Sequence, residues 1–281
     1  MNRPRRVLGA ALGLSWVLAT ATCGTTGVSS GGSIVPADDR GVHIDSELAV
    51  RRVAEGAFVV THEPAFDSNV LVVRMADGTV VICSSPFDTQ ATRTMLRWIR
   101  AALAPGRIVA INTHFHPDGT AGNEAYAEAG VETYATELTQ RLLAERGAQI
   151  RDGAASAMKG SALASRVLTT RIVPATHTIK AAEGTVFTIG GETVRVIYPG
   201  PAHSPDNVVV HLPARGILFG GCMIKTGSSI GNTADADLGH WEAAVRSVEP
   251  LGARIVVPGH GPAGGPELFE NTLAIVKAAR F

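Results

Sequence analysis

Short runs of apolar, mostly β-branched residues alternate with polar turn residues along the first half of the chain. Runs of roughly four to eight such residues, bounded by Gly, Pro, Asn or Asp, are typical of strands. They predict strands at residues 48–53, 57–61, 69–75, 79–83 and 107–111. Between the last two, apolar residues recur at helical spacing, which predicts an amphipathic helix from about Asp88 to Leu103.

The second half of the chain repeats this order of strands followed by helices. Strand-like runs occur near residues 171–175, 185–189, 193–198, 207–212, 216–219 and 254–257. Helices are predicted at about 239–248 and 266–279, and the segment 136–166 between the halves is predicted as helix with glycine breaks. Two such halves predict an α/β fold, specifically a four-layer αβ/βα sandwich with one cleft along the shared sheet edge.

The N-terminal residues have a different pattern. Three arginines precede an apolar run from Val7 to Leu18, and small residues follow it. A charged start, an apolar stretch and small residues before a cleavage site are features of a signal peptide, and this run is too short for a permanent membrane span. We therefore expect residues 1–21 to be a signal peptide and the mature protein to be periplasmic.

Two other export signals stay open as alternatives. Cys23 is a candidate lipoprotein cysteine, and Arg5-Arg6 is a weak match to a twin-arginine signal. After the signal, the Gly- and Ser-rich residues 22–44 predict a flexible tether. Residues 45–281 then form the one remaining domain, which is long enough to bury a substantial core.

Composition narrows the possible function classes. Lys and Arg total 25, as do Asp and Glu, so the chain lacks the excess charge that favours nucleic-acid partners. Of the cysteines, Cys83 lies in a strand-like run and is expected to be a small buried hydrophobe. A Cys83–Cys222 disulfide is the alternative that an oxidising compartment would allow.

Residues that commonly bind metals follow several of the predicted strands. The stretch NTHFHPDGTAGN, residues 112–123, directly follows the predicted strand 107–111. In open α/β sheets, such strand ends are where ligands bind. The candidate ligands, each in a Gly- or Pro-rich loop after an apolar run, are His114, His116, Asp118, His203, Cys222 and His260. The remaining histidines have no companions at suggestive spacing; they are His43, His62, His177, His211 and His240.

These ligand types form two chemical groups. Three imidazoles suit a catalytic Zn²⁺ that keeps a fourth position for water. A carboxylate, a thiolate and one more imidazole suit a second, softer zinc site. Two zinc ions roughly 3.5–4 Å apart can share a hydroxide and act together in a hydrolysis. The sequence therefore predicts two Zn²⁺ per chain and a hydroxide nucleophile at neutral pH.

Several motifs resemble a known family. The stretches SNVLVV, DGTVVI, INTHFH, YPGPAHSPDNVVV, LFGGCMIK and PGHG are similar to those of class B metallo-β-lactamases with a three-His and an Asp-Cys-His zinc site. The similarity covers residues 45–281 and implies that this domain is catalytic and has the metallo-β-lactamase fold. It implies a first zinc held by His114, His116 and His203, and a second zinc held by Asp118, Cys222 and His260.

The resemblance also implies an activity. It implies hydrolysis of the β-lactam amide bond of penicillins, cephalosporins and carbapenems through a zinc-bound hydroxide, and hence antibiotic resistance. Asp118, Lys225 and Asn232 are the expected catalytic residues. Lys225 would meet the substrate carboxylate, and Asn232 would hold the lactam carbonyl oxygen. The expected partner is a β-lactam antibiotic, with no nucleic acid, no permanent membrane span and a monomeric chain.

Two positions depart from the commonest pattern of this family. Ser84 stands where most of these enzymes carry an acidic residue, and Gly119 where many carry a basic one; both departures match one branch of the β-lactamases. Other hydrolases of the superfamily have HxHxDH and a bridging aspartate, which Gly119 and Cys222 argue against. The alternatives left open are a di-zinc hydrolase for a thioester, lactone or phosphoester, and an exported metal-binding protein without turnover.

Two candidate substrate-binding residues have simpler alternatives. Lys225 could be an ordinary solvated surface charge, as most lysines are. Phe66 is the only large apolar residue in the loop Thr61–Asn69, where it would form one wall of the cleft and bind substrate. The alternative places Phe66 in the core, packed against the sheet.

Overall fold

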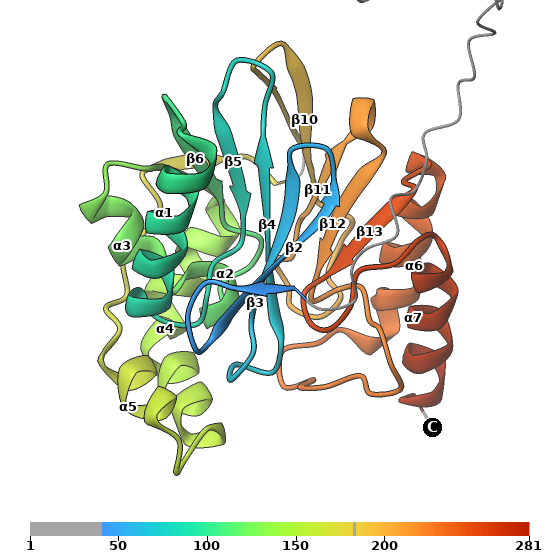
Figure 1. Cartoon of the computed structure of the whole chain (residues 1–281). Helices are drawn as coiled ribbons and strands as arrows, with labels where there is room; N and C mark the ends of the chain where they lie inside the picture. The colour runs from blue at the N-terminus through green and yellow to red at the C-terminus, as the bar shows by residue number, and fades with distance from the viewer. Residues whose placement is uncertain (1–40, 182–183, 281) are drawn as a thin grey trace, which may run out of the picture. The chain divides into compact units, whose positions relative to one another are not determined.

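The computed structural model describes residues 41–181 and 184–280, all within one compact unit of the chain (Figure 1). Outside these residues lie the expected signal peptide, its lipoprotein and twin-arginine alternatives, and the expected tether up to residue 40. The last residues of the expected tether include the short edge strand β1 (Val42–His43). No helix in the described part of the chain is long and apolar enough to cross a bilayer.

The first sheet has eight strands among the described residues, and they follow chain order. Neighbours from β1 to β5 are antiparallel, and neighbours from β5 to β8 are parallel. The strands after β1 are β2 (Leu48–Ala54), β3 (Ala57–His62), β4 (Ser68–Arg74), β5 (Val80–Cys83), β6 (Ile108–Ile111), β7 (Glu132–Thr136) and β8 (His177–Ile179). The predicted strands β2 to β6 are confirmed, whereas β1 and β7 were not predicted.

The strand predicted at residues 171–175 is wrong. The side chain of Gln140 binds both the N–H and the carbonyl of Ala175, at 3.1 and 2.8 Å. Pro174 has no N–H to offer to a strand ladder. The backbone of this segment is therefore not available for pairing with β7, and the eighth strand begins only at His177.

The second sheet has the order β13-β12-β11-β10-β9 within the described ranges. Only β12 and β13 run parallel to each other. Its strands are β9 (Thr185–Ile189), β10 (Glu192–Ile197), β11 (Val209–Leu212), β12 (Ile217–Gly221) and β13 (Ile255–Pro258). All of them were predicted from their apolar runs.

Helices lie outside the two sheets (Figure 1). Helix α1 begins where the Asp88 carboxylate accepts the N–H of Ala91, and it ends at Ala104, whose φ of 43° is left-handed. The helices are α1 (Thr89–Leu103), α2 (Pro117–Thr120), α3 (Asn123–Glu128), α4 (Glu137–Ala157), α5 (Ala162–Thr169), α6 (Leu238–Val248) and α7 (Glu267–Ala278), with 3₁₀ turns η1 (Pro213–Arg215) and η2 (Glu249–Leu251). The long predicted helices are confirmed, and the short helices α2 and α3 were not predicted.

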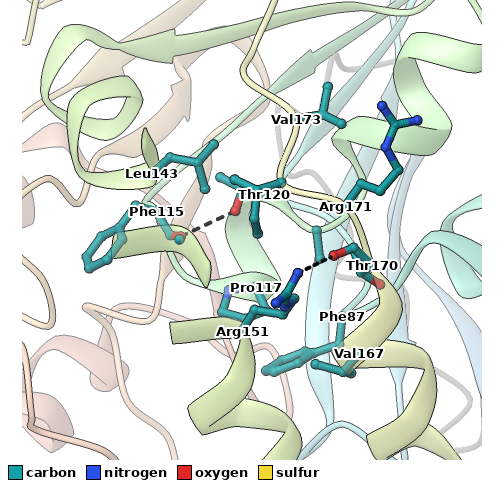
Figure 2. Close-up of a pocket in the computed structure, with 13 residues that line it drawn as sticks. Phe87, Phe115, Pro117, Thr120, Leu143, Arg151, Val167, Thr170, Arg171 and Val173 are labelled. Atoms are coloured by element: carbon teal, nitrogen blue, oxygen red, sulfur yellow. Dashed lines mark hydrogen bonds between the residues drawn. The ribbon is translucent and has the colours of Figure 1, made fainter. Parts of the chain in front are cut away.

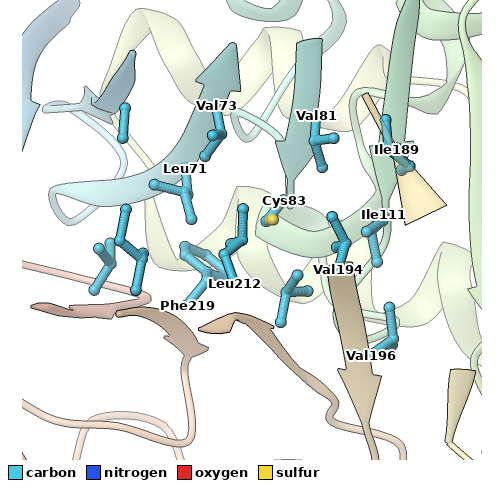
Figure 3. Packing of buried hydrophobic residues seen from close by; sticks show 14 of the residues in the cluster. Leu71, Val73, Val81, Cys83, Ile111, Ile189, Val194, Val196, Leu212 and Phe219 are labelled. Carbon is cyan, nitrogen blue, oxygen red and sulfur yellow. The ribbon is translucent and has the colours of Figure 1, made fainter. Parts of the chain in front are cut away.

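Three apolar clusters hold four layers together. Between the sheets, Leu71 and Cys83 of the first sheet face Val194 and Phe219 of the second (Figure 3). A second cluster packs the first sheet against α1 and α3, and a third packs the second sheet against α6 and α7. These contacts confirm the αβ/βα sandwich. Because Cys83 is a buried free thiol within the inter-sheet core, as predicted, the alternative disulfide to Cys222 is wrong.

The topology brings several strand ends to one edge of the sandwich. Strands β5 and β6 are parallel, as are β12 and β13, so the carboxyl ends within each pair point the same way. The loop after β6 carries His114, His116 and Asp118, and the loop between β10 and β11 carries His203. The loops after β12 and β13 carry Cys222 and His260.

Candidate metal centre

Three buried histidines come together at this edge. Their ring nitrogens, from His114, His116 and His203, lie within 4.8 Å of one another. His116 Nδ1 is 3.2 Å from His203 Nε2. The loop is fixed locally because Pro117 starts helix α2, which turns the chain immediately after His116. The structure thus assembles the first predicted ligand set.

The second predicted ligand set is assembled around Asp118. The Cys222 thiol donates to Asp118 Oδ2 at 2.8 Å, and His260 Nε2 is 3.4 Å from the same oxygen. His260 Nδ1 donates to the backbone carbonyl of Phe66 at 2.9 Å. Because this contact holds the proton on Nδ1, the lone pair of Nε2 faces Asp118 and is available to a metal.

The two sets adjoin each other through His114. Its Nε2 lies 3.3 Å from Asp118 Oδ1, is buried, and makes no hydrogen bond within the described residues. A buried nitrogen without a hydrogen bond, among five other ligand-type groups, is available to a cation. Three imidazoles beside a carboxylate, a thiol and a fourth imidazole are the ligand types that Zn²⁺ prefers. The residues present therefore fit zinc.

The charges of the second set point the same way. Burial alone would raise the pKa of Asp118, yet the neighbouring His114 and His260 hold it well below its usual range. Burial and the Asp118 carboxylate raise the pKa of the Cys222 thiol. The carboxylate is therefore ready to bind a cation, whereas the thiol needs a metal to become a thiolate.

Two glycines allow the ligands to approach so closely. A Cβ at Gly119 would lie 2.1 Å from the carbonyl oxygen of His114, and a Cβ at Gly259 would lie 2.5 Å from Cys222 Sγ. No side chain fits at either position without a shift of the backbone. The departure noted at Gly119 thus has a steric reason in this chain.

Ser84, the other departure, lies behind His114 at the end of β5. Its backbone has a φ of 73°, a strained value for serine, and its hydroxyl is 2.6 Å from that of Thr113. The carbonyl of Ser84 also accepts a hydrogen bond from Tyr126 at 3.0 Å. The Ser84 hydroxyl thus holds Thr113, the residue that precedes His114, and Tyr126 holds Ser84.

Lys225 and Asn232 lie on the segment after Cys222. Lys225 is only 8% exposed, with Nζ 5.4 Å from the centre of the Trp241 ring, so it is not a solvated surface lysine. Burial lowers its pKa, against the opposing effect of Cys222 and Asp118. Gly231 passes near this ammonium, since a Cβ there would lie 3.8 Å from Nζ. Asn232 is exposed, and its Oδ1 accepts the N–H of Ala234 at 3.0 Å.

Phe66 lies beside the second ligand set but not in the core. Its side chain is 56% exposed and meets the ring of Phe87 edge-on, with 6.2 Å between ring centres. The core alternative is therefore wrong. The loop is held by Asn69, whose side-chain amide donates to the carbonyls of Pro258 and Gly261.

Sequence reasoning missed two groups of residues. One is Asp235, which accepts a hydrogen bond from His116 Nε2 at 2.9 Å and another from Arg146. The hydrogen bonds from His116 and Arg146 lower the pKa of Asp235 to about 2. No local motif in the sequence pointed to Asp235, because its partners lie far from it along the chain.

The other group surrounds His62, whose ligand-type companions in the fold are not at suggestive spacing in the sequence. His62 lies with Glu47 and Asp88, and their ligand atoms are within 4.8 Å of one another. Arg166 donates to both carboxylates. These four residues, which we call the Arg166 cluster, come from separate elements, so no local motif could reveal them.

Comparisons with known proteins agree with this geometry. A model of the metallo-beta-lactamase superfamily matches residues 64–260. The metallo-beta-lactamase type 2 of Bacteroides fragilis is 30% identical over 213 residues, which cover 74% of this chain and 75% of that protein. The protein of the same name from Bacillus cereus is 30% identical over 217 residues, covering 76% and 74%.

Solved structures are similar as well. The metallo-beta-lactamase FIM-1 from Pseudomonas aeruginosa, in its mono-zinc form, has a TM-score of 0.68 and 29% identity, covering 84% of this chain and 98% of its own. The metallo beta lactamase from Hirschia baltica has a TM-score of 0.67 and 31% identity, covering 82% and 98%. Both fold and sequence therefore point to one family.

Proposed function

The chain belongs to the metallo-beta-lactamase superfamily and is a zinc hydrolase, and we propose that it is an exported β-lactamase that works with two zinc ions. The observation that carries this proposal is the pair of adjoining ligand sets, one of three histidines and one around Asp118. Relatives that are about 30% identical bear the name metallo-beta-lactamase, which supports a β-lactamase activity.

We assign the two ions to the two ligand sets. The first would be held by His114, His116 and His203, which keeps one tetrahedral position open. The second would be held by Asp118, Cys222 and His260. Bound there, zinc supplies a Lewis acid and hydroxide at neutral pH. Asp118 lies where the two ligand sets meet. Its carboxylate oxygens would orient the groups that carry protons during the reaction.

Other residues of this chain would bind and orient the substrate. The Lys225 ammonium, buried three residues after Cys222, would meet the carboxylate that β-lactams carry. The side-chain oxygen of Asn232, Oδ1, already accepts the Ala234 N–H. Its side-chain nitrogen, Nδ2, therefore remains as a donor for the lactam carbonyl oxygen. Phe66, exposed next to the second set, would form an apolar wall of the cleft.

The proposed substrates are penicillins, cephalosporins and carbapenems, so that the enzyme would confer antibiotic resistance. We propose a periplasmic, monomeric protein, with residues 1–21 as signal peptide, 22–44 as tether and 45–281 as catalytic domain. Ser84 and Gly119 favour the branch of the family that includes the São Paulo metallo-β-lactamase, and that relation is part of the proposal.

One experiment separates this function from its alternatives. Purified protein is given a chromogenic cephalosporin, with and without a chelator, and then a thioester, a lactone and a phosphoester. Hydrolysis of the cephalosporin that stops with chelator and returns with zinc supports the proposal. Chelator-sensitive hydrolysis of another ester class alone would favour a different di-zinc hydrolase, and zinc binding without any turnover would favour a metal-binding protein.

A further inference from the structure

His116 is held from both sides of its ring. Nδ1 faces His203 Nε2 at 3.2 Å, whereas Nε2 donates to Asp235 Oδ2 at 2.9 Å. The carboxylate therefore places the ring proton on Nε2 and leaves the Nδ1 lone pair pointing into the first ligand set. A carboxylate in this position fixes both the tautomer and the direction of a metal-binding imidazole.

Asp235 is in turn held by an arginine from a distant helix. Arg146 Nη2 donates to Oδ1, the oxygen that His116 leaves free. The Asp235 side chain is 4% exposed, so neither oxygen can rely on water. Without Arg146, the carboxylate would keep one hydrogen bond and could rotate away from His116.

The position of Arg146 follows from how α4 packs. Leu143, Arg146 and Gly147 recur at helical spacing and share one face of α4. Leu143 and Gly147 line a cavity of about 10 Å³ together with Phe115, directly behind the ligand loop (Figure 2). This volume holds at most a single water, so the cavity is a packing contact and not a ligand site. The Arg146 guanidinium lies 5.2 Å from the centre of the Phe115 ring, on the same loop.

We propose that Arg146 is a positioning residue for the first zinc site. It holds Asp235, and through Asp235 it fixes the tautomer and direction of His116. Because Asp235 is three residues after Asn232, the same contact also links the substrate segment to α4. The inference rests on the proposed function only in so far as the three histidines hold zinc, because its test measures metal binding and not turnover.

The test measures zinc affinity in the metal-free protein and its variants. Each protein is titrated with zinc in competition with a chromophoric chelator, and separately with cobalt, whose absorption with the Cys222 thiolate reports the second site. We expect Arg146→Ala to weaken the first site by roughly 10- to 100-fold, as for other groups that hold a metal-binding histidine. The second site should be unaffected, and Arg146→Lys should restore part of the affinity.

Asp235→Asn supplies a second variant of nearly the same shape. An amide nitrogen facing His116 Nε2 would favour a proton on Nδ1, which blocks the ligand atom, so this variant should lose at least as much affinity as Arg146→Ala. Arg93→Ala is the matched control. It removes an arginine with two hydrogen bonds to Glu128, at 2.9 and 2.8 Å, on α1 and α3. Its zinc affinity should equal that of the wild type.

Two results would overturn the proposal. One is unchanged affinity at the first site in Arg146→Ala and Asp235→Asn. The other is an equal loss at both sites with a lower melting temperature of the metal-free protein, which would make Arg146 a fold-stabilising residue only. If the wild type binds zinc but hydrolyses no β-lactam, the proposed function fails while this inference can still be supported. A wild type that binds no zinc overturns both.

Discussion

The candidate metal centre and the Arg166 cluster are built from similar side chains. Each contains a group of three residues whose potential ligand atoms lie within 4.8 Å of one another. In each, a histidine is buried beside carboxylates. Yet in the metal centre the tautomers of His116 and His260 direct lone pairs toward the other ligand groups, whereas the Arg166 cluster already holds its own cation. The comparison shows that closeness of ligand-type residues alone does not make a metal site.

The proton on each imidazole explains the difference. In the Arg166 cluster, His62 Nδ1 accepts the N–H of Phe87 at 3.2 Å, so the proton of the neutral ring must be on Nε2, which faces Glu47 at 3.6 Å. Burial lowers the pKa of His62, and the nearby Asp88 and Glu47 only partly offset this. In the metal centre, the outer nitrogens of His116 and His260 donate, which turns their lone pairs inward.

The cations differ as well. The Arg166 guanidinium bonds to Glu47 and Asp88, so a metal ion would have to displace it. Asp118 has no arginine or lysine within salt-bridge distance among the described residues; its neighbours are His114, His260 and the Cys222 thiol. The metal centre should therefore depend on zinc, and the Arg166 cluster on its arginine. The following predictions test this division.

The largest expected effect is the loss of activity on metal removal. A chelator should lower the rate of cephalosporin hydrolysis by at least about three orders of magnitude, because without zinc nothing in the site supplies hydroxide at neutral pH. Metal analysis should find about two zinc ions per chain, and Cys222→Ser should lose the second selectively. Finding one zinc in the wild type and the same content in Cys222→Ser would contradict the ligand assignment.

Arg166→Met should destabilise the fold without changing the zinc content. It leaves the buried Asp88 and the partly buried Glu47 without their cation, which should cost about 3 kcal/mol of the free energy of unfolding. Denaturant unfolding and metal analysis of the same samples check both statements. Arg93→Ala, which removes an exposed pair, should have a far smaller effect. A change of zinc content in Arg166→Met, in either direction, would contradict this division between the two regions.

The two regions also differ in how far they could be predicted. The candidate metal ligands were predictable because each lies in a loop that follows an apolar strand, and the sandwich brings those loops together. Asp118, for example, lies within the local motif of the first loop. The strand wrongly placed at 171–175 failed because an apolar run does not reveal that a distant side chain, that of Gln140, has already bound its backbone.

The Arg166 cluster could not be predicted for a related reason. Glu47, His62 and Asp88 come from a strand start, a strand end and a helix cap, and Arg166 comes from α5, so only the tertiary fold joins them. Asp235 and Arg146 are likewise 89 positions apart. Partners that set the proton on a histidine thus lie beyond the reach of local motifs, although the histidine itself does not.

Lys225 is a further cation that can be compared with Arg166, and it is more deeply buried, at 8% exposure. Unlike Arg166, it forms no salt bridge with a carboxylate in the described residues, and the Trp241 ring lies beside its ammonium. Its charge is therefore available to a substrate. Lys225→Ala should cost about 1.5–3 kcal/mol of transition-state stabilisation with substrates that carry a free carboxylate. Values of kcat/KM for these substrates and for ester-masked analogues provide the check, and equal losses for both would contradict a role in binding the carboxylate.

Phe66 gives the smallest expected effect, because its ring is largely exposed. It belongs to the loop that joins the two regions. This loop starts at His62 in the Arg166 cluster and reaches the metal centre through the Phe66 carbonyl. Phe66→Ala keeps that carbonyl and removes only the exposed ring. We expect about 1 kcal/mol of lost substrate binding, or roughly fivefold in KM, with kcat nearly unchanged, as for contacts made equally in ground and transition states.

The melting temperature and the zinc content of Phe66→Ala should also stay near those of the wild type, because the ring is 56% exposed. Val186→Ala, which removes an apolar side chain that is 67% exposed on β9, should leave KM unchanged and serves as the control. A wild-type KM in Phe66→Ala would show that the ring is not a wall of the cleft. A lower zinc content would instead show that the ring helps to hold the carbonyl against His260, so that this side chain acts on the metal centre and not on the substrate.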